Sequence, residues 1–385
     1  MFENIPKNWK KDKLENISSV NYGTRIVKES STGNEYYVYG GGDKTFKTDT
    51  YNRENTLIVA RFGMSPKCTR FVKGKFFLND SGLTVDTNNN NLLNQDFLNW
   101  QLFFLNDLIY SLGKGVAQKN LNVTLFKKIN IAIPPTLEEQ QEIVDVLDAA
   151  SEIIRLRTAC IESAQSLIPA LFQEMFGDMH DKNENLVAIG SVIEETSQVN
   201  PQKLFTDQFL YIDISSINNE TGIIESPKII NIDNIPSRAR KLVKVDDLLV
   251  AMTRPYLKGF AMVPENLDNN IASTGFSVLR AQKDKIVPKY LYAYIRSDYF
   301  INQIIPKMRG ANYPAVTDND VKSVKIPLPK LDQQELFAAK VQEIEAYIKI
   351  QQAELEKAQT MFNSLLHHAF TGKLTENITF EVENE

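Results

Sequence analysis

The chain repeats one series of short segments about 194 residues further along. Each copy has a strand-like run that ends at a proline, in residues 129–134 and 324–329, and then a Leu-x-x-Gln run, in residues 137–140 and 331–334. A long stretch with apolar residues at helical spacing follows each time. Because segments that recur in the same order reflect a repeated structural unit, the sequence predicts two copies of one plan.

The length of 385 residues allows two domains, each with its own hydrophobic core. No apolar run approaches the roughly 20 residues that cross a bilayer. The N-terminus lacks the apolar core of a signal peptide, and the two cysteines are too few for a disulfide framework. These features predict a cytoplasmic protein.

Two compact regions precede the helical stretches. Residues 1–134 contain short β-rich runs separated by Gly, Asn and Asp turns, and the apolar spacing predicts one helix over residues 96–108. Residues 182–329 repeat this plan. We therefore predict an α+β fold with two pseudo-symmetric mixed α/β domains joined by two long helices. The predicted boundaries are 1–134 for the first domain, 135–178 for the first long helix, 179–329 for the second domain, 330–375 for the second long helix and 376–385 for an acidic tail.

The two helical stretches, residues 137–176 and 331–370, share one heptad register. Their apolar residues alternate in steps of four and three, which predicts a coiled coil, although a core helix in a larger domain also carries an apolar stripe. Arg157 and Gln351 are polar residues at equivalent seam positions. If the helices pair, these two side chains form a polar layer that fixes the register. Alternatively, Arg157 extends its charged end into solvent.

Charge is distributed unevenly along the chain, whose formal net charge is -5. Residues 1–134 hold 18 Lys and Arg against 12 Asp and Glu, and residues 182–329 hold 18 against 16. The helical segments are acidic, with 2 against 10 in residues 135–181 and 5 against 10 in residues 330–385. A phosphate-binding surface needs local positive charge rather than a positive total. The compact regions, above all the first, are therefore candidates for nucleic-acid binding.

The sequence offers no convincing catalytic or metal-binding constellation. It has no Gly-Lys-Ser/Thr phosphate loop, and the glycine-rich residues 40–44 lack the helix start that follows a nucleotide loop. The three histidines, His180, His367 and His368, have no cysteine at metal-ligand spacing. We therefore predict no catalytic residue, no metal site and no cofactor in this chain.

The order and duplication of these segments resemble the specificity subunit of type I restriction–modification systems. The run Phe-Thr-Gly-Lys-Leu at residues 370–374 is typical of that family, and residues 209–280 are similar to a common form of its target recognition domain. The resemblance extends from Trp9 to Leu374. In the recognition domain it rests on residues 211–214, 237–239, 247–249 and 273–276.

The resemblance implies a division of labour within a larger complex. Two target recognition domains would each read one half of a split double-stranded DNA target, while the two long helices would pair antiparallel and set the gap between the half-sites. Two methyltransferase subunits would dock on the helices and domains, and restriction subunits would join the full complex. Adenine methylation and DNA cleavage, with S-adenosylmethionine, ATP and Mg, would belong to those partners, and this chain would be non-catalytic.

Candidate DNA contacts follow from residue type and position. Arg, Lys, Asn and Gln read base edges, while Lys, Arg, Tyr and others contact phosphates. Such side chains cluster beside glycines in residues 114–120 and 309–313. Each one alone is equally well explained as a solvated surface group, so the prediction rests on the clusters. The predicted DNA-binding residues are Lys44, Lys47, Arg61, Lys114, Gln118, Lys119, Asn120, Arg238, Arg240, Arg254, Tyr256, Lys258, Arg309, Asn312 and Tyr313.

Two other functions compete with this interpretation. A coiled-coil scaffold without sequence-specific DNA binding would carry the same helices, but the positive balance of residues 1–134 favours DNA binding. A stand-alone restriction or methylation enzyme would need cofactor and catalytic loops that the sequence lacks. The target bases do not follow from sequence, because readout depends on groove geometry and DNA shape.

Overall fold

The computed structural model of the protein describes residues 5–28, 33–116, 118–182, 185–371 and 373–374. The predicted acidic tail, residues 376–385, lies outside the described residues. The chain forms two compact units. Unit 1 contains the described residues up to Thr158 and from Ala353 onward, and unit 2 spans Ala159–Gln352. Among the described residues, no helix has a stretch long and apolar enough to cross a membrane.

Unit 1 is built on a six-stranded sheet in the order β2-β7-β5-β6-β3-β4. Neighbouring strands are antiparallel except β3 and β6, which are parallel. The helix α2 packs on this sheet, and residues of both share one buried core. The elements that begin in this part of the chain are β1 Lys10–Lys13, α1 Leu14–Ile17, β2 Ser18–Tyr22, β3 Tyr36–Tyr39, β4 Lys47–Thr48, β5 Arg53–Ala60, β6 Thr69–Leu78, β7 Gly82–Thr87, α2 Gln95–Phe104, α3 Asn106–Ser111, β8 Gly113–Lys114, β9 Asn120–Leu121, α4 Val123–Phe126, β10 Asn130–Ile133 and α5 Leu137–Asp181.

Unit 2 contains two four-stranded sheets, β12-β19-β16-β17 and β14-β13-β18-β15. The first is antiparallel throughout, and the second contains the parallel pair β13 and β18. The strands and α-helices that begin in this part of the chain are β11 Leu186–Ala188, β12 Ile193–Glu194, β13 Gln208–Ile212, β14 Lys228–Asn231, β15 Ala239–Leu242, β16 Leu248–Ala251, β17 Phe260–Met262, β18 Ile271–Ser273, β19 Phe276–Ala281, α6 Pro288–Arg296, α7 Asp298–Ile304, α8 Asp318–Lys322, β20 Lys325–Pro327 and α9 Leu331–Thr371.

The duplicated sequence encodes a duplicated plan, as predicted. The shared sheet has the order β2-β7-β5-β6 in unit 1 and β12-β19-β16-β17 in unit 2. Two helices follow it, α2 and α3 or α6 and α7, and then a short helix, α4 or α8. The last strand, β10 or β20, pairs with the first strand of its region and leads directly into the long helix. The predicted mixed α/β regions and long helices are therefore confirmed.

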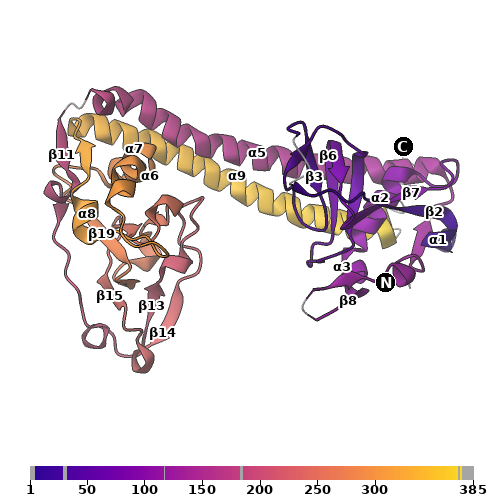
Figure 1. Cartoon of the computed structure of the whole chain (residues 1–385), viewed down its shortest axis with the longest axis horizontal. Helices are drawn as coiled ribbons and strands as arrows, with labels where there is room; N and C mark the ends of the chain where they lie inside the picture. The colour runs from indigo at the N-terminus through magenta and orange to yellow at the C-terminus, as the bar shows by residue number, and fades with distance from the viewer. Residues whose placement is uncertain (1–4, 29–32, 117, 183–184, 372, 375–385) are drawn as a thin grey trace, which may run out of the picture. The chain divides into compact units, whose positions relative to one another are not determined.

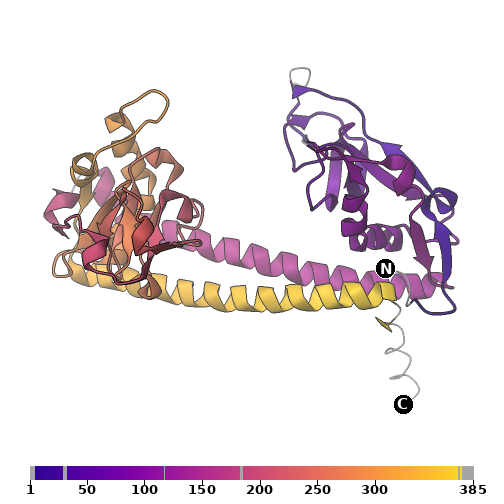
Figure 2. The same ribbon diagram turned by 90° about the horizontal axis from the view of Figure 1, so that it is seen from below.

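The long helices are shared between the units. Each unit contains the start of one helix and the end of the other, because α5 runs from unit 1 into unit 2 and α9 runs the opposite way. Within each unit the two segments lie side by side, as Figure 1 and Figure 2 both show. Ile143 shares a core with Phe370 in unit 1, and Phe176 shares one with Phe337 in unit 2. The segments are therefore antiparallel in each unit.

The predicted single helix over residues 96–108 is wrong, because α2 and α3 are separate helices. Leu105 leaves helical geometry at φ -81° and ψ 10°. The Asn106 side-chain oxygen then accepts hydrogen bonds from the backbone N–H groups of Cys68 at 3.0 Å and Thr69 at 3.1 Å. Leu105 and Ile109 are both buried, so the apolar spacing continues across the break and conceals it.

The repeated Leu-x-x-Gln run fastens each long helix to its own domain. The Gln140 side-chain oxygen accepts a hydrogen bond from the Asn94 N–H at 2.7 Å, and that of Gln334 accepts one from the Val287 N–H at 2.9 Å. Each amide also donates to two backbone carbonyl oxygens. Asn94 and Val287 are the residues before α2 and α6, and both glutamines are buried. This recurring contact explains why the motif occurs twice.

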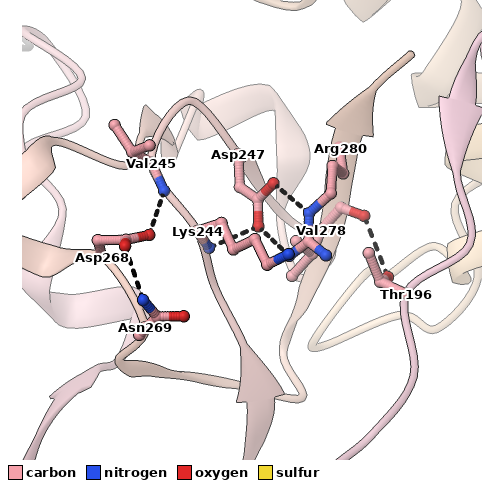
Figure 3. A network of polar contacts seen from close by, with 8 residues as sticks. All are labelled: Thr196, Lys244, Val245, Asp247, Asp268, Asn269, Val278 and Arg280. Atoms are coloured by element: carbon pink, nitrogen blue, oxygen red, sulfur yellow. Dashed lines mark hydrogen bonds and ion pairs between the residues drawn. The ribbon is translucent and has the colours of Figure 1, made fainter. Parts of the chain in front are cut away.

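A buried ion pair stabilises the shared sheet in unit 2. Asp247, which is 1% exposed, accepts hydrogen bonds from the Arg280 guanidinium at 2.8 and 2.7 Å and from the Lys244 N–H at 2.8 Å. Figure 3 shows that this contact joins the turn before β16 to the strand β19. The Asp247 carboxylate raises the pKa of Arg280, so the guanidinium stays charged.

Candidate nucleic-acid interface

In unit 1, the turn after β5 lies against the segment that ends in β9. The Leu121 N–H donates to the Arg61 carbonyl oxygen at 2.8 Å, and the Met64 N–H donates to the Lys119 carbonyl oxygen at 2.8 Å. These backbone bonds join two polar segments that are about 55 residues apart in the sequence. The structure thereby brings together the predicted residues Arg61, Lys114, Gln118, Lys119 and Asn120.

A polar side chain of the hairpin β8–β9 bonds it to the turn after β5. Lys114 pairs with Asn120 across the hairpin. The Asn120 side-chain oxygen accepts a hydrogen bond from the Gly63 N–H at 3.2 Å. Gln118 lies beside the same glycine, where a Cβ would be 3.3 Å from its Nε2 atom. Asn120 therefore holds the hairpin against the turn after β5, while Lys114 and Gln118 are exposed to solvent.

Lys44 and Lys47 form a second group in unit 1, next to the first. Their ammonium groups lie over the Tyr37 ring, 4.9 and 4.7 Å from its centre. The glycine-rich loop that leads to Lys44 contacts the turn after β5, since a Cβ on Gly41 would be 2.2 Å from the Phe62 carbonyl oxygen. Residues 40–44 therefore belong to the same region of the surface as Arg61.

Aromatic rings accompany the cations of unit 1. The Arg61 guanidinium lies over the rings of Tyr22 at 4.7 Å and Phe62 at 4.4 Å, and the Lys119 ammonium lies over Tyr110 at 3.7 Å. A surface of cations and aromatic rings suits phosphates and exposed bases. Sequence reasoning missed these aromatic residues. The adjacent pair Arg61-Phe62 offered a local signal, whereas Tyr22 and Tyr110 come from distant elements.

The corresponding surface of unit 2 lies between the turn after β16 and the segment before α8. The Arg254 N–H donates to the Pro314 carbonyl oxygen at 2.8 Å. The Arg254 guanidinium lies over the Tyr313 ring at 5.1 Å and donates to the Asn312 carbonyl oxygen at 3.3 Å. Tyr256 follows in the same turn and is exposed. Three predicted residues, Arg254, Asn312 and Tyr313, are thus in direct contact.

Two predicted cations of unit 2 have carboxylate partners. Lys258 pairs with Asp298 at 3.0 Å, and Arg309 pairs with Asp320 at 3.6 Å. Hydrogen bonds from the backbone and side chain of Thr317 lower the pKa of Asp320, so this carboxylate is charged beside Arg309. A DNA phosphate that binds either cation must compete with these carboxylates. Arg309 is nevertheless 72% exposed and accessible from solvent.

Arg238 and Arg240 belong to the second sheet of unit 2. The Arg238 carbonyl oxygen accepts a hydrogen bond from the Thr274 N–H at 2.8 Å, and its side chain lines a shallow pocket with Asp213 and Lys228. The Arg240 guanidinium donates to the preceding carbonyl oxygen at 3.1 Å. The structure therefore groups these arginines with β13–β15 rather than with the contacts of Arg254. Lys228 is a further basic residue that the sequence prediction missed.

The predicted polar layer of the long helices involves both units. Within unit 1, Arg157 forms an ion pair with Glu354 at 3.6 Å. Gln351 belongs to unit 2. The proximity of Arg157 and Gln351 therefore stays a prediction.

The two surfaces consist of cations, amides and aromatic rings. Within the ranges that the structure describes, no group of three or more His, Cys, Asp or Glu side chains is arranged to hold a metal ion. These surfaces suit the binding of an anionic polymer.

Comparison with known proteins connects this architecture to one family. A sequence model described as the type I restriction modification DNA specificity domain matches residues 6–164 and 189–360. The type I restriction enzyme MjaVIII specificity subunit of Methanocaldococcus jannaschii is 22% identical to this chain, and the match covers 80% of this chain and 78% of that protein.

A solved structure shows the same fold. The crystal structure of the type I restriction-modification system S subunit from M. genitalium matches 96% of this chain and 97% of its own chain, with 18% identity and a TM-score of 0.59. The HsdS subunit from Thermoanaerobacter tengcongensis is 43% identical over 46% of this chain. That match spans 45% of the other chain, with a TM-score of 0.40.

Proposed function

Because the chain belongs to the type I restriction–modification DNA specificity family, we propose that it directs a complex of this kind to a split DNA sequence. Residues 1–134 read one half of the target, and residues 182–329 read the other half. The helices α5 and α9 set the gap between the half-sites. The two matched segments of the family and the duplicated fold support two reading modules in one chain.

The observation that carries this proposal is a repeated surface with different side chains. Lys114 in unit 1 and Arg309 in unit 2 each precede a glycine with positive φ, Gly115 at 116° and Gly310 at 97°. Both lie in a segment that is hydrogen-bonded to the turn after the third strand of the shared sheet, β5 or β16. Because the framework is shared and the exposed side chains differ, the two surfaces suit different half-sites.

In this proposal the chain itself is non-catalytic. Two methyltransferase subunits dock on the helices and globular regions, and restriction subunits join them in the full complex. S-adenosylmethionine, ATP and Mg act in those subunits. Exposed apolar residues on the long helices, such as Leu156, Leu167 and Ile350, support protein–protein contacts there.

An exchange of one module tests the reading of half-sites. Residues 182–329 are replaced by the equivalent region of another family member, and the methylated motif is determined by sequencing DNA from cells that carry the hybrid and its methyltransferase subunit. One half of the motif should change while the other half stays the same. A change in both halves contradicts modular reading, and a complex without any motif favours the scaffold interpretation.

An insertion into the long helices tests whether they set the gap between the half-sites. Four residues, about one helical turn, are inserted beside Arg157 in α5 and at the equivalent position beside Gln351 in α9. The recognised gap should change while both half-sites remain the same. A motif with an unchanged gap would show that these helices do not set the distance. An insertion into one helix alone should disturb the polar layer and lower the stability of the pair.

A further inference from the structure

The turn that joins β16 to β17 presents two apolar side chains to solvent. Tyr256 is 42% exposed and Leu257 is 48% exposed, and they are neighbours in the single 3-10 turn Pro255–Leu257. Exposed apolar surface is unfavourable in water, and adjacent exposed apolar side chains often mark a binding site. Neither side chain belongs to the buried cores described for unit 2.

The backbone on both sides of this tip is strained. Arg254 has φ 49° and Lys258 has φ 54°, in the left-handed region that non-glycine residues rarely adopt. Such a conformation persists only where the surroundings fix it, and it is found most often at functional sites. Here Pro255 is buried, Arg254 donates to the Pro314 carbonyl oxygen and Lys258 pairs with Asp298. The turn is therefore held in place with its tip pointing away from the core.

Cations flank the apolar tip, and two of them are paired with carboxylates. Arg254 and Lys258 are its two ends, and Arg309 lies on the segment that is hydrogen-bonded to the turn. Tyr313, which contacts Arg254, is 73% exposed. A duplex presents phosphates at its edge and a stack of bases inside. An apolar tip with flanking cations is therefore complementary to a duplex whose base stack is opened at one step.

We propose that Tyr256 and Leu257 form a wedge that enters one base-pair step of the half-site read by unit 2 and unstacks it. Arg254 and Arg309 hold the phosphates on either side of that step. The proposal rests on the proposed function, because it needs DNA bound to this surface. The wedge makes the sequence preference at that step depend on how easily the step deforms, in addition to direct base contacts.

Unit 1 lacks these features in the equivalent turn. Residues 61–68, like residues 252–259, join the third strand of the shared sheet to the fourth. Its exposed aromatic residue, Phe62, has the Arg61 guanidinium over its ring at 4.4 Å, and the next apolar residue, Met64, is buried. The positive φ of 60° falls on Gly63, which adopts it without strain. The wedge therefore belongs to the half-site of unit 2 alone.

Fluorescence of 2-aminopurine tests the wedge. The full chain is assembled with its methyltransferase subunits on duplexes that carry this base at each position of both half-sites in turn. Unstacking should raise the fluorescence at one step of the half-site of unit 2. The double substitution Tyr256→Ala with Leu257→Ala should abolish the rise and weaken binding about tenfold, because two apolar contacts are lost. A duplex with a mismatch at that step should restore most of the affinity.

Three controls separate a wedge from a structural defect. Tyr256→Phe should keep the fluorescence rise, and Ile229→Ala removes an exposed apolar side chain elsewhere in unit 2 and should change nothing. Assembly with the methyltransferase is measured for each variant, and a double variant that fails to assemble overturns the proposal in favour of a protein contact. If the wild-type complex binds its target specifically without any fluorescence rise, the wedge is wrong and the proposed function stands. If the complex has no DNA preference, both fail.

Discussion

In unit 1 the strands β3 and β4 extend the shared sheet through β6, whereas unit 2 has a separate second sheet, β14-β13-β18-β15. The strands that differ in unit 1 are β3 and β4, which lie between β2 and β5 in the chain. In unit 2 they are β13, β14 and β15, between β12 and β16, and β18, between β17 and β19. The four shared strands and the helices that follow keep the same order in both units. The strands that differ between the units are therefore separate from the segments that attach to the long helices.

The last strand before each long helix is bonded to a glutamine side chain in both units. Ala132 of β10 and Lys325 of β20 each exchange two hydrogen bonds with a glutamine side chain, although the two copies place Ala132 opposite Pro327 rather than Lys325. The glutamine is Gln101 of α2 in unit 1 but Gln303 of α7 in unit 2. The last strand of each unit is thus bonded to a glutamine, but at a different backbone position and from a different helix. What the two copies share is a pattern of bonds, and the residues that supply them have diverged.

The largest expected effect concerns the ion pair of unit 2. Asp247→Ala leaves the Arg280 guanidinium, only 19% exposed, without its carboxylate partner. Such a loss costs roughly 3–5 kcal/mol of stability. Hydrogen exchange should therefore show a loss of amide protection in β16 and β19, with the sheet of unit 1 unaffected. The free energy of unfolding measured with denaturant should fall by a similar amount.

A matched control is available in unit 1. There the Arg53 guanidinium donates to the neutral hydroxyl of Thr84 at 2.9 Å. Thr84→Val removes a hydrogen bond worth about 1 kcal/mol, so its effect should be several times smaller. Asp247→Leu combined with Arg280→Met should recover most of the lost stability, since no charge is left buried. Equal effects of Asp247→Ala and Thr84→Val would contradict the special role of the ion pair.

The next largest effect is expected at Gln140 and Gln334, the glutamines that fasten each long helix to its domain. Gln140→Leu and Gln334→Leu each remove the acceptor of a buried N–H group, which costs about 1–3 kcal/mol. The two losses should be similar, because the hydrogen bonds are equivalent. The amide exchange of Asn94 and Val287 reports each site separately. Gln333→Leu is the control, since Gln333 is exposed next to Gln334 and should tolerate the change. Unequal losses would mean that the units depend differently on this contact.

The sequence predicts the framework better than the surfaces. The repeat located both long helices and both attachment glutamines, because helical periodicity and a duplicated motif are local signals. The sheet of β13 and β18 could not be predicted, since this parallel pair joins segments about 60 residues apart and β18 has only three residues. The basic members of each surface followed from charge, but Tyr22, Tyr37 and Tyr110 join them only through tertiary contacts.

A smaller effect concerns phosphate binding. Lys114→Ala and Arg309→Ala should each flatten the dependence of log affinity on log salt by about one unit of slope and leave the recognised sequence unchanged. The binding of the assembled complex is measured at several salt concentrations for target and non-target DNA. A loss of discrimination at one half-site instead would identify the residue as a base reader. Asp320→Asn should tighten binding, because it releases Arg309 from its carboxylate partner.

The smallest expected effect is on the alkylation of the two cysteines, one of which lies in each unit. Cys68 is 1% exposed, and burial raises its pKa to about 11. Cys160 is partly exposed on α5 and lies 3.0 Å from the Tyr347 hydroxyl. Alkylation requires the thiolate, so at pH 8 iodoacetamide should modify Cys160 first, and Cys68 only after unit 1 opens. As pH rises toward 11, the folded-state thiolate of Cys68 should become populated, although burial still limits access. Mass spectrometry of timed samples gives the alkylation rate at each cysteine.

Asp247→Ala should leave the alkylation rate at Cys68 unchanged, because that substitution acts in unit 2. If Asp247→Ala raises the alkylation rate at Cys68, the two units unfold together. That result would contradict the view that each unit is stabilised independently.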